Sequence, residues 1–304
     1  MKKILGKLFV WGFCGFGYFL NLLPHRVFLL FVDGLSGILR LVDKRRYKDA
    51  MSNLDFVYGE SKTLEEKQAI IKRCYRNFSF VLLESARALY MKPQKLLERF
   101  EYENLEALKN LVAEGKSAVL ISAHFGYWEA IANSIPHFAP NYGKYSLGRL
   151  TQFQAINELI IRSRENYGVK LIDKKGSFKQ LLKIYMKPRQ IAGIIVDQNM
   201  SESEAVWVKF FGKEVTHTPV ASILSRRFEI PILPVFIDFN EDYTHFVVKF
   251  IDPFYCPNTH DMEADLLEAT QKQADITQEI IEKYPSSWLW FHKRFKAKYP
   301  QIYS

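Results

Sequence analysis

The sequence predicts an α/β protein with a mostly parallel central sheet flanked by helices, preceded by an N-terminal apolar helical membrane anchor. The first supporting observation is that, from about Ser117 onward, short apolar runs alternate with helical patterns, as in parallel sheets. The second is an uncharged 18-residue run, 8–25, between Lys7 and Arg26. The length of 304 residues and the 48% hydrophobic content exclude a disordered chain and allow one large domain or two small ones.

The uncharged run and the apolar stretch that follows it, 27–41, form the expected anchor. A spanning helix needs roughly 17–25 apolar residues, so the run is at the short end of that range. Its three glycines weaken a spanning helix, whereas Trp11 and Tyr18 suit an interfacial position. We therefore expect an anchor that spans the membrane or lies in its interface. A buried core helix and a cleaved signal peptide are the alternatives, although no small-x-small cleavage site follows the run.

The chain is expected to consist of two regions, the anchor followed by the α/β domain. Residues 1–45 are expected to form the anchor and residues 46–304 the α/β domain, with 46–100 as a helical lead-in. The lead-in contains a long helical pattern, 63–90, in which Thr63 and Glu66 form a candidate capping box.

Strands and helices then alternate. The expected strands are Ser117–Ala123, Lys144–Leu147, Val169–Ile172, Ile191–Val196 and Ile232–Phe239. The expected helices are Gln152–Tyr167, Ser177–Met186, Pro219–Phe228 and Met262–Tyr284. The strand that ends at Phe239 and the run His245–Ile251 read as an antiparallel pair around the turn Asn240–Asp242.

Composition narrows the function classes. The three cysteines are far apart in the sequence, which excludes a disulfide scaffold and a cysteine-based zinc module. Lys and Arg total 42 against 33 Asp and Glu, a net charge of +9, and aromatic residues make up 15% of the chain. A basic, aromatic-rich protein suits either nucleic acid or an anionic membrane surface.

A histidine follows the first expected strand of the α/β domain. Ligands of open α/β sheets bind beyond the carboxyl ends of the strands, and His124 lies at such an end. Glu129 follows at H-x4-E spacing, which places the two side chains on different faces of a continuous helix. They can meet only if His124 lies in the turn before a helix, and Gly126 makes such a turn easy. The spacing alone leaves open a helix-start histidine with an unrelated surface glutamate.

Further polar residues follow other elements. Asp197 and Gln198 end the strand Ile191–Val196, where an aspartate can position a base or simply cap a turn. Thr218 and Pro219 have the pattern of a helix start, which attracts anions. The basic candidates for holding a phosphate are Arg149, Arg162 and Arg164, with solvated surface charge as the alternative for each. Gly212 and Lys213 follow two phenylalanines. The block 288–296 mixes aromatic and basic residues, which leaves three interpretations open: a core helix, a membrane-interface patch or a phosphate site.

Together these residues resemble the lipid A biosynthesis lauroyl/myristoyl (late) acyltransferases, within the H-x4-D/E glycerophospholipid acyltransferase superfamily. The ordered set carries the resemblance over nearly the whole chain: an apolar N-terminus, HFGYWE from His124, an Arg-x-Arg ending at Arg164 before Gly168, DQN from Asp197, FFGK ending at Lys213 with Thr216, and WLWFHKRFK from Trp288. Position 129 holds Glu rather than Asp, which the family allows. Arg149 and Arg162 are harder to align than Arg164.

The resemblance implies transfer of a fatty acyl chain from acyl carrier protein to a hydroxyl of an acylated glucosamine disaccharide phosphate. His124 is then the general base, Glu129 orients it, and Arg164 or backbone N–H groups stabilise the oxyanion. The residues then expected to bind substrate are Arg149, Arg164, Asp197, Gln198, Gly212 and Lys213. No metal or resident cofactor is expected. The acyl groove is expected among Phe125, Tyr127, Trp128, Phe210 and Phe211.

The implied partners are acyl carrier protein, whose acidic surface a +9 enzyme would attract, and a membrane lipid. The implied location is the bacterial inner membrane, with the catalytic domain facing the cytoplasm. An acyltransferase acting on a lysophospholipid, glycerol phosphate or an aminolipid shares the same motif and stays open. A nucleic-acid binder lacks a recognisable signature, and a metal hydrolase lacks a third ligand at metal spacing. The sequence does not determine acyl chain length, acylated position or oligomeric state.

Overall fold

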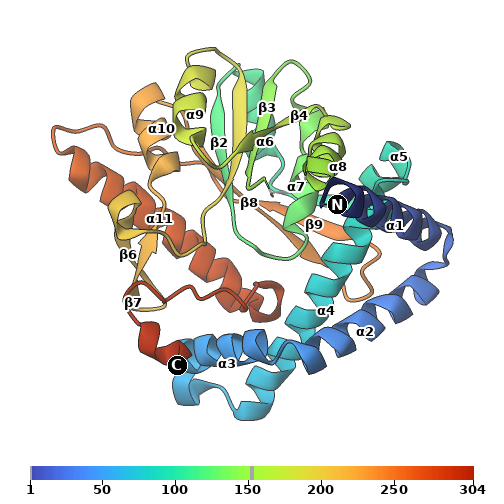
Figure 1. Ribbon diagram of the computed structural model, residues 1–304. Coiled ribbons are helices and arrows are strands. Elements are labelled where there is room, and N and C mark those ends of the chain that lie inside the picture. The colour runs from blue at the N-terminus through green and yellow to red at the C-terminus, as the bar shows by residue number, and fades with distance from the viewer. Residues whose placement is uncertain (1, 151–153) are drawn as a thin grey trace.

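The computed structural model describes residues 2–150 and 154–304 (Figure 1). The helices are α1 Lys2–Leu22, α2 His25–Val42, α3 Lys44–Tyr58, α4 Leu64–Ala88, α5 Pro93–Leu97, α6 Glu106–Ala113, α7 Ile131–Ser134, α8 Gln154–Glu165, α9 Ser177–Tyr185, α10 Val220–Phe228 and α11 Met262–Lys283. The strands are β1 Phe100–Glu103, β2 Ala118–Ser122, β3 Gly143–Gly148, β4 Val169–Asp173, β5 Gln190–Ile195, β6 Val206–Phe210, β7 Lys213–His217, β8 Ile232–Phe239 and β9 Phe246–Phe250.

The described residues form one mixed sheet in the order β1-β9-β8-β2-β5-β3-β4 and a separate β6-β7 hairpin. Within the mixed sheet only the pair β8/β9 is antiparallel, so the prediction of a mostly parallel α/β sheet is confirmed. The pairing of β8 with β9 is the predicted antiparallel pair. Helices cover both faces: α9, α10 and α11 lie on one side and α1, α4 and α8 on the other (Figure 1).

The predicted elements agree closely with the structure. The capping box at the start of α4 is present, since Thr63 N donates to Glu66 Oε2 at 2.7 Å and Glu66 N donates to Thr63 Oγ1 at 3.3 Å. The expected helix Gln152–Tyr167 is α8, although its first two residues lie outside the described part of the chain. Strand β1, helix α6 and the β6-β7 hairpin were not predicted from the sequence. Strands β1 (FEYE) and β7 (KEVTH) contain no apolar run, and α6 has only eight residues over which to show a helical period.

The N-terminal region does not match the spanning form of the expected anchor, which the sequence predicts to span the membrane or to lie in its interface. Residues 2–42 form two helices, α1 and α2, broken at Pro24. No helix among the described residues combines the length and apolarity needed to cross a bilayer, so a spanning anchor is not supported. Leu20, Phe28 and Val32 are fully buried in the largest core cluster together with side chains of α4. The remaining faces of α1 and α2 expose large apolar side chains: Trp11, Phe16, Tyr18, Phe19, Leu22, Leu30, Phe31, Ile38, Leu41 and Val42.

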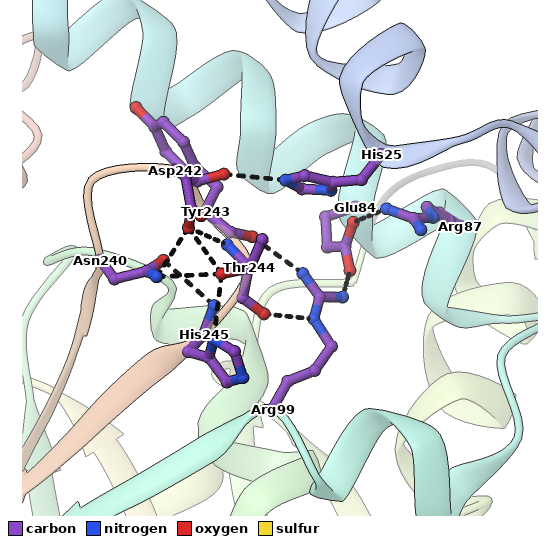
Figure 2. A network of polar contacts seen from close by, with 9 residues as sticks. All are labelled: His25, Glu84, Arg87, Arg99, Asn240, Asp242, Tyr243, Thr244 and His245. Atoms are coloured by element: carbon purple, nitrogen blue, oxygen red, sulfur yellow. Dashed lines mark hydrogen bonds and ion pairs between the residues drawn. The ribbon is translucent and has the colours of Figure 1, made fainter.

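A polar network attaches the junction between α1 and α2 to the rest of the protein (Figure 2). His25 Nε2 lies 2.8 Å from the backbone oxygen of Asp242 in the turn between β8 and β9. Below it the Glu84 carboxylate of α4 is fully buried and forms ion pairs with Arg87 and Arg99. Arg99 also donates to the backbone oxygens of residues 243 and 244, at 3.0 and 2.8 Å. The network therefore ties α2, α4 and the β8-β9 turn together.

The C-terminal block 288–296 is neither a helix nor a surface patch. It runs as an irregular segment whose Trp288, Trp290 and Arg294 side chains are completely buried. Trp288 forms an isolated antiparallel bridge with Phe125, and Leu289 N donates to His124 O at 2.9 Å. This segment thus packs directly against the loop that follows β2.

Candidate active site

Two adjacent parallel strands bring His124 and Asp197 together. Strands β2 and β5 pair in parallel with Ser122 opposite Ile195. His124 lies two residues after Ser122, and Asp197 lies two residues after Ile195. The register therefore places the two residues side by side beyond the carboxyl edge of the sheet. This edge is where open α/β sheets bind ligands.

The contacts between the two residues are direct. His124 Nδ1 lies 2.8 Å from Asp197 Oδ1, and His124 N donates to Asp197 Oδ2 at 2.9 Å. Trp288 Nε1 donates to the same Oδ2 at 2.8 Å. Asp197 is nearly inaccessible, whereas 23% of the His124 side chain is exposed. Because Nδ1 is held by the carboxylate, Nε2 is the ring nitrogen left to act on a substrate.

Electrostatics tune both groups. Burial lowers the pKa of His124, but the charge and hydrogen bond of Asp197, with a smaller contribution from Glu129, outweigh it and raise that pKa above its ordinary value. Burial alone would raise the pKa of Asp197, but His124 and the Trp288 N–H hold it well below its usual range. The aspartate is therefore a permanent anion at neutral pH, and it stabilises a protonated imidazole beside it.

Glu129 is hydrogen-bonded to two other side chains rather than to His124. Its Oε1 accepts from Trp128 Nε1 at 3.1 Å, and its Oε2 accepts from Arg164 Nη2 at 2.6 Å. The carboxylate that is hydrogen-bonded to the imidazole in the structure is that of Asp197, not that of Glu129. The physical reason is the short 3-10 turn 128–130, which directs the glutamate toward α8, while Asp197 enters from the adjacent strand.

The backbone N–H groups of residues 125–127, directly after His124, are all hydrogen-bonded within the fold. Phe125 N donates to Ala123 O at 2.7 Å, Gly126 N to Ser287 O at 2.8 Å, and Tyr127 N to Ile237 O at 3.0 Å. Gly126 has φ of 54°, and a Cβ there would lie 1.8 Å from Ile237 O, so this position needs glycine. The loop is thus fixed rigidly behind the histidine.

A cavity of about 1380 Å³ opens beside His124 and is mostly apolar. Of the residues predicted to bind substrate, Arg149, Arg164 and Gln198 line it, as do His124 and Glu129. Lys174, which was not predicted, lines it too and donates from Nζ to Gln198 Oε1 at 2.8 Å. Arg162 is on the same helix as Arg164 but is exposed and absent from the cavity wall that the described residues define.

Gly212 and Lys213 lie elsewhere. Gly212 has φ of 69° and forms the tight β6-β7 turn together with Phe211. Lys213 Nζ stacks over the Phe56 ring at 4.9 Å. Neither residue belongs to the cavity wall formed by the described residues, so the structure does not bring them to His124.

Most aromatic residues expected to form an acyl groove belong to the core instead. Phe125, Tyr127 and Phe210 are at most 1% exposed, and among the five candidates only Trp128 lines the cavity. Most of the aliphatic side chains in the wall come from the strands and from α7. The contact of Trp288 with Asp197 could not be predicted from the sequence, because a tryptophan in an aromatic block carries no signal of its hydrogen-bond partner.

A second buried cluster lies behind Asp197. His292 Nε2 accepts from Asn199 N at 2.8 Å, and burial lowers the pKa of His292 to about 4. Arg294 Nη2 lies 3.1 Å from His217 Nδ1. Burial and the charge of Arg294 lower the pKa of His217 to about 3, and burial lowers the pKa of Arg294 to about 10. Both histidines are thus neutral, and Arg294 supplies a buried positive charge near Asp197.

The protein thus combines an open, mostly parallel α/β sheet with a histidine–carboxylate pair beside a large, mostly apolar cavity. This combination defines a class of α/β proteins that can act on a substrate with a long apolar part. The chain belongs to the bacterial lipid A biosynthesis acyltransferase family, whose pattern matches residues 2–297. It is therefore an enzyme of an acyl-transferring family.

Named relatives agree with this assignment at low identity. The lipid A biosynthesis palmitoleoyltransferase of Escherichia coli (strain K12) is 22% identical over 283 residues, covering 91% of this chain and 87% of that protein. The lipid A biosynthesis lauroyltransferase of the same organism is 21% identical over 277 residues, with the same coverage. A lipid A biosynthesis acyltransferase of Haemophilus influenzae is 21% identical over 296 residues, covering 95% of this chain and 88% of that relative.

Proposed function

We propose that this protein transfers a fatty acyl chain from an acyl carrier protein thioester to a hydroxyl of a lipid A precursor, an acylated glucosamine disaccharide phosphate, with His124 as general base. The observation that carries the proposal is the His124–Asp197 pair, 2.8 Å apart, beside a large apolar cavity. A histidine whose pKa is raised above its ordinary value by a neighbouring carboxylate is suited to removing a hydroxyl proton. The family membership supplies the acceptor class.

The proposed step is a direct transfer. His124 Nε2 takes the proton of the acceptor hydroxyl as the hydroxyl oxygen attacks the thioester carbonyl. The new C–O bond forms, the C–S bond breaks, and the leaving thiolate takes the proton back from the imidazolium. Asp197 holds the ring and stabilises its protonated form. No acyl-enzyme and no metal are required by this scheme.

Arg164 is the proposed oxyanion group. It lines the cavity, its side chain is 17% exposed, and only Nη2 is used in the ion pair with Glu129. The remaining guanidinium N–H groups can donate to a developing negative charge. The backbone N–H groups of 125–127 are not available for this role, because they are already hydrogen-bonded within the fold.

The choice of acyl carrier protein as donor rests on the basic charge of the protein, and the proposed membrane attachment rests on exposed apolar side chains. The exposed Lys174, Lys175 and Lys179 line the cavity together with Arg149. These basic side chains and a net charge of +9 favour an acidic carrier protein as the donor's partner. The exposed apolar side chains of α1 and α2 favour attachment to the interface of the bacterial inner membrane, where the acceptor lipid lies.

The test is acyl transfer in membranes, with a radiolabelled acyl carrier protein donor and an under-acylated lipid A precursor. Wild-type protein should form product, and the rate should fall as salt is added, because charge attraction to the carrier is screened. Transfer only to a lysophospholipid, glycerol phosphate or an aminolipid would keep the chemistry and replace the acceptor. Equal rates with coenzyme A donors at all ionic strengths would overturn the carrier assignment.

A further inference from the structure

One glycine in the middle of the sheet has open space where a side chain would stand. A Cβ built on Gly193 of β5 would meet nothing closer than Tyr145 O, at 3.9 Å. The other glycines of the mixed sheet differ, because a Cβ on Gly143 would lie 2.1 Å from Gln190 and one on Gly148 would lie 2.8 Å from Leu171. Glycine in a strand interior costs stability, so an open glycine in a central strand marks space that something else fills.

The space at Gly193 belongs to the cavity beside His124. Leu120 of β2 and Ser146 of β3 stand in register on either side of Gly193, and in a parallel sheet registered partners point to the same face. All three line the cavity, and on this face Ile131 and Ile135 cover it. Leu120 and Ile135 belong to one apolar core cluster, with Ile131 packed against it. We call this part of the cavity, between β2, β5, β3 and the segment 131–139, the sheet channel.

The sheet channel leads away from the reacting histidine. Asp197 lies four residues beyond Gly193 and six beyond Ile191, so the channel reaches about 13 Å to the glycine and about 20 Å to the isoleucine at roughly 3.3 Å per residue. Lys144 stands opposite Ile191 in the register and lines the far end. Its Nζ donates to Ala139 O at 3.1 Å, and burial lowers the pKa of Lys144.

We propose that the sheet channel holds the acyl chain being transferred, that the missing side chain of Gly193 sets how long a chain it admits, and that Lys144 marks its polar end. The proposal rests on the acyltransferase function proposed above. An alkyl chain gains stability with each methylene that it buries among aliphatic side chains. A methyl terminus that reached an ammonium group would have to desolvate it, so the favourable contacts stop there.

The experiment compares donors that carry lauroyl, myristoyl and palmitoyl chains on one acceptor. In Gly193→Val the branched side chain fills the channel, so preference moves to the shorter chain. The ratio of kcat/KM between donors two carbons apart should change by about tenfold, as expected for two methylenes denied burial. Gly193→Ala should give a smaller change in the same direction. Lys144→Met should move preference to the longer chain, whereas Lys170→Met, on the exposed part of β4, should leave it unchanged.

A second measurement does not need transfer. Fatty acids of the same three lengths are used to displace a fluorescent fatty acid from each protein, and thermal unfolding checks that each variant is folded. Shifted displacement profiles in the folded variants, with no transfer by wild type, would support the channel and overturn the acyltransferase function. Transfer by wild type with identical donor ratios in folded Gly193→Ala and Lys144→Met would overturn the channel. A shift that follows the acceptor's own acyl chains rather than the donor's would overturn it as well.

Discussion

His124 Nδ1 and Asp197 Oδ1 lie 2.8 Å apart although 73 positions separate the two residues in the chain. The register of β2 and β5 creates this pair, because each residue follows the same registered position by two. Glu129 is the carboxylate nearest to His124 in the sequence, but it forms an ion pair with Arg164 instead. The pairing fixes which ring nitrogen faces the substrate, and the predictions about catalysis depend on it.

Replacement of the proposed base should abolish most activity without unfolding the protein. A positioned general base contributes about 10²–10⁴ in rate, so His124→Ala should lose activity within that range. Acyl transfer in membranes measures it, with thermal unfolding of the purified variant as the control for folding. Activity within a few-fold of wild type would remove His124 as the base.

Asp197→Asn should change both the rate and its pH dependence. The base works as neutral imidazole, and its pKa is raised above the ordinary value of about 6.5, so wild-type kcat/KM should fall as pH falls through a midpoint above that value. The asparagine removes the charge that raises this pKa while burial remains. The low-pH limb should therefore move to lower pH, and the maximal rate should fall by about 10³–10⁴ because the imidazolium loses its anion.

The matched control for that experiment is Glu129→Gln. Glu129 also raises the pKa of His124, but less than Asp197 does, so its low-pH limb should move in the same direction by a smaller amount. A larger displacement in Glu129→Gln than in Asp197→Asn would show that the glutamate, and not the aspartate, stabilises the protonated histidine.

The residues that could be predicted from the sequence are those whose local pattern carries a physical meaning. Alternating apolar runs and helical periods gave the order of strands and helices, and Thr63 with Glu66 gave the start of α4. His124 and Asp197 were both identified as strand-end residues. Their contact was not, because strand register depends on the packing of the whole sheet rather than on any short segment.

The lining of the cavity could not be predicted from the sequence. The expected acyl groove was placed among the aromatics near His124, yet Phe125 and Tyr127 are buried core residues. Large aromatic side chains have more to gain from a closed core than from an open cavity, and sequence alone does not separate the two uses. Gly193 illustrates the opposite case, since an empty space has no sequence signature at all.

The ion pair between Glu129 and Arg164 should matter more for rate than for substrate affinity. If Arg164 stabilises the oxyanion, its N–H groups act in the transition state, so Arg164→Met should lower kcat by about 10²–10³ with a small change in KM. Arg162→Met is the matched control, because Arg162 is on the same helix but exposed. Steady-state kinetics on both variants tests this, and a rise in KM with unchanged kcat would assign Arg164 to substrate binding alone.

The buried neutral histidines should make the protein sensitive to mild acid. The pKa of His217 is lowered to about 3 in the folded state, against an ordinary value of about 6.5. The unfolded chain therefore binds the proton first, so this stability is complete above about pH 6.5 and is lost as pH falls from there toward 3, by at most about 1.4 kcal/mol per pH unit. His217→Gln should flatten the decline between pH 6.5 and 5 in urea unfolding. An equal decline in that variant would exclude His217 as a source.

The buried carboxylate of Glu84 should be a major contributor to the stability of the N-terminal half. It is fully buried between Arg87 and Arg99, and Figure 2 shows how Arg99 continues from it to the β8-β9 turn. Glu84→Gln leaves two guanidinium groups without their anion, so the free energy of unfolding should fall by about 3–5 kcal/mol. Glu106→Gln breaks the exposed pair with Lys109 and should cost at most about 1 kcal/mol. Urea unfolding of both variants at pH 7.5 makes the comparison, and equal losses would show that the Glu84 network contributes no more than a surface ion pair.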